Sequence, residues 1–313
     1  MTLIHTFTVG GLRCHALEGG LQHLDGGAMF GVVARPLWQK RITPDERNRI
    51  RLGLRCLLVE HPAGLVLIDT GIGNKEDQRF TDIYGVENQS REGRPTQLED
   101  ALAEAGYAAA DVRWVINTHL HFDHAGGNTA VTRSDGRTVS AVPESADRPT
   151  VPMSVELAFP NATYVVQRAE LEFARQTNER TRASYLPPNF EPVAEALRWH
   201  LLTGSGEILP GIAARITPGH VPYHQSILLH DGGEAALFLG DVIPTSLHLP
   251  LPWIMGYDLE PMRTLESKRA LLREAAGGGW LLIFGHDAEV VLGRATMGPK
   301  QVELTDVVRR PSS

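Results

Sequence analysis

The sequence of 313 residues has only two cysteines, no long hydrophobic run and no excess of basic side chains. Cys14 and Cys56 each lie within a strand-like run, so we interpret them as small buried hydrophobic residues rather than as a disulfide. No stretch of about 20 apolar residues is present, which argues against a membrane-spanning helix. The first residues, MTLIHTFTVGG, lack the charged and apolar regions of a secretion signal, and we therefore expect a cytoplasmic protein without a membrane partner.

The balance of charge is acidic, with 30 Lys and Arg against 37 Asp and Glu and a net charge of −7 at pH 7. A nucleic-acid channel needs clustered basic side chains to neutralise phosphates, so nucleic acid is not expected as a partner. No charged or Pro/Gly-rich linker divides the chain, which favours a single domain over residues 1–313. Residues 131–157 are rich in Ser, Pro, Arg and Asp and show little periodicity, so we expect a mobile insertion there.

Three histidines and an aspartate are concentrated in residues 118–127, THLHFDHAGG, directly after the apolar run VRWVINT that is typical of a buried strand. Imidazole and carboxylate groups together favour a transition-metal site. His119 and His121 are two residues apart and can face one way on an extended segment, whereas the adjacent Asp123 and His124 must diverge. The pattern predicts two neighbouring metal ions that share one loop. The alternative is a histidine-rich surface turn.

Other polar side chains also follow apolar, strand-like runs. The runs end near residues 68, 118, 217, 240 and 285, and the polar groups within about two residues of them are Asp69, His119, His220, Asp241 and His286. Groups at strand ends are held by rigid elements, as a preorganised site requires. Composition and spacing alone indicate a mixed α/β metalloprotein.

Residues 224–230 and 234–240 predict a β-hairpin, because the turn signal Asp231-Gly232-Gly233 joins them. If residue 232 centres the turn, opposed positions sum to about 464, which places Asp241 opposite about residue 223. His220 and Asp241 are therefore expected at the same end of the hairpin.

The motif in residues 118–127 resembles the HxHxDH motif of the metallo-β-lactamase superfamily, and it is most similar to the branch of N-acyl homoserine lactonases and methyl parathion hydrolase-like enzymes. DTG, TPGH, GD and GH follow in the family's order, so that the resemblance covers about residues 50–290. It implies an α+β fold, a four-layer αββα sandwich, with a binuclear metal site between the sheets. The ligands it implies are His119, His121 and His220 for one metal and Asp123, His124 and His286 for the other, with Asp241 as the bridge.

The resemblance also implies two divalent metal ions, Zn²⁺ in the first place, with Mn, Co or Fe as alternatives. Two such ions generate a bridging hydroxide from water, and Asp123 is placed to pass a proton to the leaving oxygen. The expected reaction opens a small-molecule lactone ester such as an acyl homoserine lactone. Hydrolysis of aryl esters or phosphotriesters is the alternative, and a homodimer is the expected assembly.

An iron redox protein of the same fold is disfavoured, because such proteins carry an acidic residue where His121 stands and a fused flavodoxin. A noncatalytic scaffold is disfavoured because all the ligand positions of the motif are kept. Pro244 stands where some lactonases carry a tyrosine that binds the substrate carbonyl, so the group that replaces this hydroxyl is open.

Two residues are expected to support the ligands by hydrogen bonding. Asp69 in DTG has this role in the family, with a simple turn residue as the alternative, and His224 either bonds within its strand or supports a ligand. A substrate pocket is expected near Met29 and Phe30, in residues 24–31, which contain too many glycines for a helix. Trp253 and Tyr257 in a later loop are further pocket candidates, and packing in the core is the alternative for all of these apolar residues.

Overall fold

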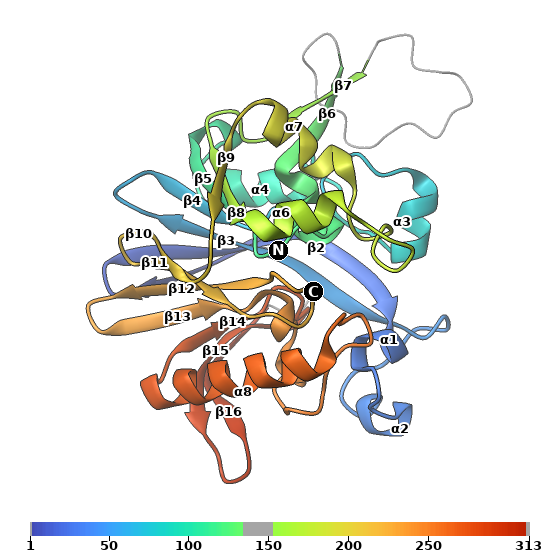
Figure 1. Cartoon of the computed structure of the whole chain (residues 1–313), viewed down its shortest axis with the longest axis vertical. Helices are drawn as coiled ribbons and strands as arrows, with labels where there is room; N and C mark the ends of the chain where they lie inside the picture. Colours follow the sequence, from blue (N-terminus) through green and yellow to red (C-terminus); the bar gives the residue numbers. More distant parts are fainter. Residues whose placement is uncertain (1, 134–152, 311–313) are drawn as a thin grey trace.

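A computed structural model describes residues 2–133 and 153–310, and in it two seven-stranded sheets lie face to face (Figure 1). The first sheet has the order β1 (Ile4–Val9), β2 (Leu12–Asp25), β3 (Arg49–Glu60), β4 (Leu65–Ile68), β5 (Val112–Ile116), β8 (Thr163–Gln167), β9 (Trp199–Leu202). The second has the order β10 (Gly206–Leu209), β11 (Ile212–Ile216), β12 (Gln225–Asp231), β13 (Glu234–Phe238), β14 (Leu281–Ile283), β15 (Val290–Met297), β16 (Val302–Arg309). Both are mixed sheets, parallel at β4–β5–β8–β9 and at β13–β14 and antiparallel elsewhere.

The inner faces of the sheets share an apolar core to which both contribute. Leu57 and Ile68 from the first sheet belong to the same buried cluster as Ile227, Phe238 and Ile283 from the second. The predicted buried cysteines are confirmed, because both are free thiols and both are buried. Burial of this interface holds the two sheets together through the hydrophobic effect.

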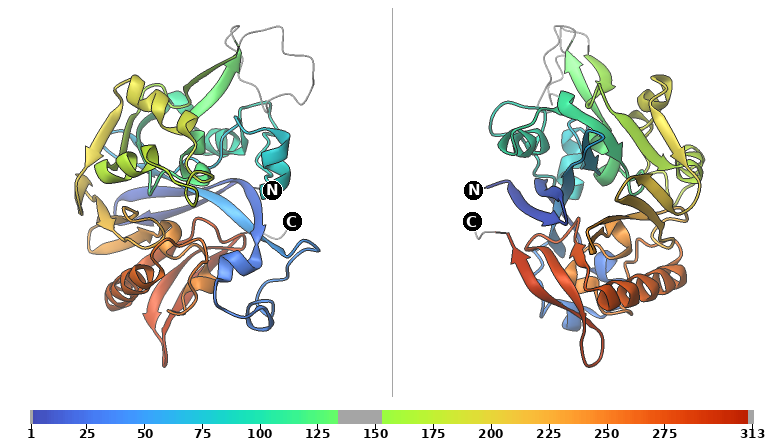
Figure 2. Two further views of the ribbon diagram at one scale, coloured as in Figure 1. Left: turned by 45° about the vertical axis from the view of Figure 1, so that its right-hand side comes forward. Right: turned by 90° about the vertical axis from the view of Figure 1, so that its left-hand side faces the viewer.

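Helices cover the outer face of each sheet, which completes the four-layer αββα sandwich expected from the sequence (Figures 1 and 2). The helix α4 (Gln97–Glu104) packs Leu98 and Leu102 onto the first sheet, and α8 (Pro261–Gly278) packs Leu271 and Leu272 onto the second. The remaining helices are α1 (Gly26–Phe30), α2 (Arg35–Trp38), α3 (Gln78–Tyr84), α5 (Phe122–Ala125), α6 (Arg168–Arg175) and α7 (Glu191–Glu195).

The prediction of a non-helical stretch at residues 24–31 is wrong, because Gly26–Phe30 form the short helix α1. Asp25 caps it, with Oδ1 accepting a hydrogen bond of 2.8 Å from the backbone N–H of Ala28. Met29 and Phe30 are both buried, at 1% and 0% exposure. The cap and this burial outweigh the cost of about 1 kcal/mol that a glycine brings to a helix.

The prediction of a mobile insertion over residues 131–157 is wrong at both ends of this range. Residues 129–133 and 153–157 pair as the antiparallel strands β6 (Thr129–Arg133) and β7 (Met153–Leu157), which project from the body as a ribbon (Figures 1 and 2). The middle of the expected mobile insertion, residues 134–152, lies outside the described residues. Alternating side chains at the two ends were too few for their period of two to stand out in the sequence.

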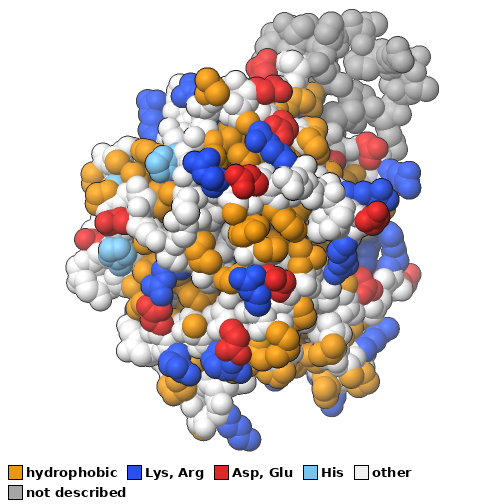
Figure 3. Space-filling view, viewed as in Figure 1, with side chains coloured by type: hydrophobic (Ala, Val, Ile, Leu, Met, Phe, Trp, Pro, Cys, Tyr) orange, Lys and Arg blue, Asp and Glu red, His pale blue; other side chains and the backbone are white. Residues whose placement is uncertain are grey.

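The charged side chains on the surface reflect the similar numbers of acidic and basic residues in the sequence. On the face shown in Figure 3, acidic and basic side chains are interspersed rather than gathered by sign. Among the residues that the structure describes, no helix is long and apolar enough to cross a membrane. The homodimer and the cytoplasmic location stay predictions.

The loop after β5 touches the loop after β4 through two glycines of the HAGG sequence. A Cβ atom at Gly126 would overlap the carbonyl oxygen of Ile72, and one at Gly127 would overlap that of Thr70. The N–H of Gly127 donates to the carbonyl of Gly71 at 3.0 Å, and that of Thr70 donates to the carbonyl of His124 at 2.8 Å. Glycine is therefore required here because the two backbones approach each other so closely.

We expect Gly127→Ala to lower the free energy of unfolding by about 1–3 kcal/mol, because its methyl group must displace the backbone of Thr70. Denaturant unfolding followed by circular dichroism measures the change. Gly277→Ala in α8 is the matched control, since its Cβ meets nothing within 4 Å, and it should be neutral or stabilise by up to ~1 kcal/mol. Equal effects of the two substitutions would contradict the steric explanation.

Candidate metal centre

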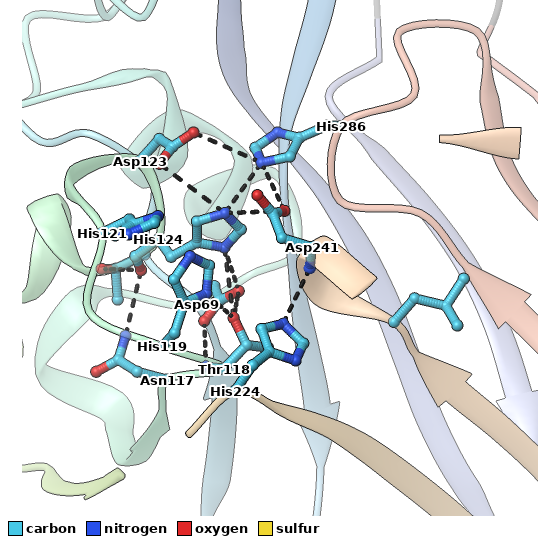
Figure 4. Close-up of polar contacts among 12 residues, drawn as sticks. Asp69, Asn117, Thr118, His119, His121, Asp123, His124, His224, Asp241 and His286 are labelled. Carbon is cyan, nitrogen blue, oxygen red and sulfur yellow. Dashed lines mark hydrogen bonds and ion pairs between the residues drawn. The ribbon is translucent and has the colours of Figure 1, made fainter. Parts of the chain in front are cut away.

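The candidate site lies where two pairs of parallel strands end. The parallel strands β4 and β5 lead to Asp69 and His119, and the parallel strands β13 and β14 lead to Asp241 and His286. Because parallel strands deliver their carboxyl ends to one edge, the four side chains converge from both sheets (Figure 4). The site therefore lies between the sheets, at the edge where their loops meet.

Seven side chains form three overlapping groups, and within each group the possible ligand atoms lie within 4.8 Å of one another. Two groups share no member, His119, His121 and His220 on the one hand and Asp123, His124 and His286 on the other, and the third group is His119, His124 and Asp241. Within them, His220 Nε2 lies 3.1 Å from His121 Nδ1, and His286 Nε2 lies 3.0 Å from His124 Nε2. The structure thus brings together all seven residues predicted as metal ligands, and their division between two metal ions stays a prediction.

Asp241 lies between the two groups. Its Oδ1 is 3.2 Å from His124 Nε2 and 3.1 Å from His286 Nε2, while its Oδ2 is 3.3 Å from His220 Nε2. Burial alone would raise the pKa of Asp241, but His286, His124 and His220 outweigh burial and hold it well below its usual value. One carboxylate, ionised at neutral pH, therefore faces both groups at once.

The donor set fits a pair of metal ions. His119 Nε2 is buried without a hydrogen-bond partner among the described residues, and such atoms are rare unless a cation or water satisfies them. Burial, and after it the neighbouring imidazoles, hold the pKa of His119 and of His121 well below the usual range, so that both are neutral. Neutral imidazole nitrogens and carboxylate oxygens are the ligands that zinc and similar cations take.

Asp69 holds the loop that carries His119, His121 and His124 by hydrogen bonds. Its Oδ1 accepts from the backbone N–H of Thr118 at 2.7 Å, and its Oδ2 accepts from the Thr118 hydroxyl and from His124 Nδ1, both at 2.8 Å. Asp69 adopts a φ of +55°, which is unfavourable for a residue other than glycine. These hydrogen bonds hold it in that conformation and leave His124 Nε2 free to face the site.

His224 fixes the backbone of Asp241. The N–H of Asp241 donates to His224 Nε2 at 3.0 Å, so the ring proton is on Nδ1 and donates to the Thr217 hydroxyl at 2.7 Å. Burial lowers the pKa of His224 to about 3, which keeps it neutral. The β12–β13 register pairs Ile227 with Phe238, one residue away from the predicted register, and its continuation sets Asp241 opposite His224.

Three partners of the ligands were missed in the sequence. Asp258 Oδ1 lies 3.0 Å from His220 Nδ1, the carbonyl of Gly53 lies 2.8 Å from His286 Nδ1, and Gln22 Nε2 donates to Asp123 Oδ2 at 2.6 Å. A backbone carbonyl leaves no trace in a sequence, and Asp258 lies in a loop without a motif. Gln22 is a fully buried amide within the strand β2, and its burial is seen only in the structure.

A buried acid supports the loop at His121. Glu170 Oε1 accepts from the backbone N–H of Leu120 at 3.0 Å and from the hydroxyl of Tyr185 at 2.9 Å. The ring of Tyr185 packs edge-on against His121, with centroids 4.7 Å apart. Burial raises the pKa of Glu170 to about 7. The segment 119–121 is therefore held from both its backbone and its side chains.

A cavity of about 190 Å³ opens in front of the candidate ligands. Met29 and Tyr257 line it, as expected. Phe30 and Trp253 do not: Phe30 is fully buried and stacks on His248, and the rings of Trp253 and Phe30 pack in a T-shaped contact. The lining residues not predicted include Leu24, Leu52, Tyr84, Phe122, Arg180, Thr181, Ser184, Met255 and Leu259.

This fold and this set of histidines and aspartates define the class of the protein. The chain belongs to the metallo-β-lactamase superfamily, whose family model matches residues 52–286. Both the predicted family and the predicted fold are confirmed.

Proteins similar in sequence to this chain include N-acyl homoserine lactonases. The chain is 27% identical over 252 residues to an N-acyl homoserine lactonase of Bacillus cereus, covering 77% of this chain and 84% of that protein. It is also 27% identical over 246 residues to the N-acyl homoserine lactonase AttM of Agrobacterium fabrum, covering 74% of this chain and 81% of that protein. These matches support the predicted class, a metal-dependent hydrolase.

Solved structures agree on the fold. A probable metal-dependent hydrolase from Staphylococcus aureus aligns with a TM-score of 0.82 at 27% identity, covering 98% of this chain and 100% of that chain. AidC, described as a dizinc quorum-quenching lactonase, aligns with a TM-score of 0.71 at 20% identity, covering 99% and 97%.

Gln22→Leu should reduce turnover by about 10- to 100-fold, because residues that orient metal ligands have effects of this size. Without the amide donor, Asp123 loses the contact that fixes its Oδ2. Steady-state kinetics and elemental analysis of the same preparations measure activity and metal content. Gln97→Leu is the control: Gln97 is also buried and donates to a backbone carbonyl, that of Glu18, away from the site. Comparable losses in both variants would show a general effect on folding.

Proposed function

We propose that the protein is a binuclear metal-dependent hydrolase that opens lactone esters of the N-acyl homoserine lactone type. The observation that carries this proposal is the arrangement of six histidines and aspartates in two groups around the buried Asp241, beside an open cavity. The similarity to lactonases over more than two thirds of the chain supports the choice of lactones.

The residues would divide between the ions as the two groups do. His119, His121 and His220 would hold one ion, Asp123, His124 and His286 the other, and Asp241, which lies between the two groups, would serve both. Two divalent cations held there would lower the pKa of water and polarise an ester carbonyl. Zn²⁺ is the ion we propose, because histidines dominate the donor set.

Asp123 is the residue we assign to proton transfer. It lines the cavity, and its Oδ2 is held by Gln22 at 2.6 Å. Its Oδ1 lies 3.9 Å from His124 Nε2 and accepts no hydrogen bond from the described residues. This oxygen can carry a proton to the alkoxide oxygen that leaves when the lactone opens, which would otherwise be a poor leaving group.

The cavity wall next to the candidate ligands suits a substrate with an apolar arm. Leu24, Met29, Leu52, Met255 and Leu259 contribute apolar side chains to it. Burial of a methylene group on such a wall contributes about 0.8 kcal/mol. Pro244 carries no hydroxyl, but Tyr84 and Tyr257 line the cavity, and burial raises the pKa of both hydroxyls, which keeps them protonated as donors.

Hydrolysis of aryl esters or phosphotriesters is the second candidate. The rings of Tyr84 and Phe122 line the cavity and pack against each other with centroids 4.8 Å apart. An aromatic leaving group can pack on such a surface.

The purified protein should bind about two transition-metal ions per chain, since seven donors exceed the four of one tetrahedral centre. Asp241→Asn should lower turnover by at least about 100-fold with the fold retained, because a neutral amide offsets the repulsion of two cations poorly. Elemental analysis and circular dichroism of both proteins test this. A reproducible content of one ion or none after zinc is supplied, or full activity of Asp241→Asn, would contradict the binuclear assignment.

A substrate panel tests the reaction. With zinc, manganese or cobalt supplied, we expect homoserine lactones to be hydrolysed faster than aryl esters and phosphotriesters. Across acyl chains of increasing length, kcat/KM should rise by up to roughly tenfold for each one or two methylenes that are buried. A flat profile with chain length, or phosphotriesters hydrolysed fastest, would favour the second candidate.

A further inference from the structure

One cation faces the cavity. Arg180 is the only lysine or arginine among the described residues that line it, and it lies in the segment between α6 and the turn at Pro187–Asn189. Its side chain is exposed, so it stands at the opening rather than among the metal-binding residues. No sequence motif marks this position.

The guanidinium of Arg180 has spare donor capacity. Its Nη2 donates to the carbonyl of Gly256 at 2.8 Å, which uses one of the five N–H groups that an arginine offers. Within residues 2–133 and 153–310 it forms no ion pair with a carboxylate, whereas nearby Arg175 is paired with Glu191 at 2.7 Å. The hydrogen bond to Gly256 orients the guanidinium group of Arg180 and leaves its other N–H groups available as donors.

Tyr257 adds a second donor on the same wall. It follows Gly256 in the chain, and burial raises the pKa of its hydroxyl to about 12, an effect that the positive charge of Arg180 partly opposes. The carboxylates of the lining, Asp123 and Asp241, both face the histidines. Arg180 and Tyr257 therefore place two hydrogen-bond donors on the same wall, and the charges of Asp25 and Asp123 also reach the Tyr257 hydroxyl and raise its pKa.

We propose that Arg180 binds a carboxylate on the substrate, at the end away from the ester that is cleaved. This inference rests on the proposed function and narrows its substrate class to lactones or esters with an acidic arm. A carboxylate is the planar group whose two oxygens match the fork of a guanidinium. The apolar side chains of Met29 and Met255 would cover the carbon chain between the two ends.

Binding to the zinc-loaded protein tests the inference without turnover. The probes are linear dicarboxylates from succinate to suberate, each compared by calorimetry with the monocarboxylate of the same length. At the length that spans the cavity, the dicarboxylate should bind about tenfold more tightly to the wild type, as expected for a charge-assisted contact that is partly open to water. Equal affinities at every length would overturn the proposal.

Two variants distinguish recognition of a carboxylate by Arg180 from support of the loop through its hydrogen bond to Gly256. Arg180→Met should remove the preference for the dicarboxylate and leave the affinity for the monocarboxylate unchanged. Arg182→Met is the matched control, because Arg182 is exposed two residues away and is not part of the lining. If Arg180 only fastens the loop at Gly256, Arg180→Met will weaken both probes equally, and the proposal is wrong.

Kinetics then connect the contact to the reaction. A lactone whose side chain ends in a carboxylate should have a kcat/KM about tenfold above that of the same lactone ending in a methyl group, with the difference in KM and absent in Arg180→Met. If neither lactone is hydrolysed, the proposed function fails, while the calorimetric result still decides the role of Arg180.

Discussion

The site depends on one buried carboxylate between two groups of histidines. Asp241 is the carboxylate that lies within 3.3 Å of His124, His220 and His286 together, so without it no single carboxylate would face all three imidazoles. The position of this carboxylate is set by its own backbone, because its N–H donates to a histidine that burial keeps neutral. His224 therefore orients the central charge without being a candidate ligand itself.

The fold makes this arrangement possible because both sheets contain a pair of parallel strands that lead to the site. In each sheet a pair of parallel strands ends at the same edge, and the polar residue after each strand points to the space between the sheets. The two loops from the first sheet are then fixed to each other by the contact at Gly126 and Gly127. Rigid strands thus set the positions of the candidate ligands, and the close backbone contact restricts the movement of the loops that carry them.

Much of this site could be predicted from the sequence, because its residues follow apolar strands in a motif with characteristic spacing. The ligands, Asp69 and the hairpin that carries Asp241 were predictable for that reason. The predicted register of that hairpin was wrong by one residue. The geometry of the turn sets the register, and the sequence does not show where the turn is centred. Helix α1 was missed because capping by Asp25 and burial of Met29 outweigh the glycines.

The residues that line the cavity were the least predictable, and the reason is structural. Most of those that were not predicted come from β2, β3, α3, the segment between α6 and the 3-10 helix at Pro187–Asn189, and the loop before α8, which are far apart in the sequence and share no motif. The candidate ligands, in contrast, follow the ends of core strands. Chemistry and selectivity are therefore encoded largely in different residues. Such a separation makes the protein evolvable: changes in the connecting segments can alter which molecules enter, while the metal-binding framework and its folding are inherited unchanged.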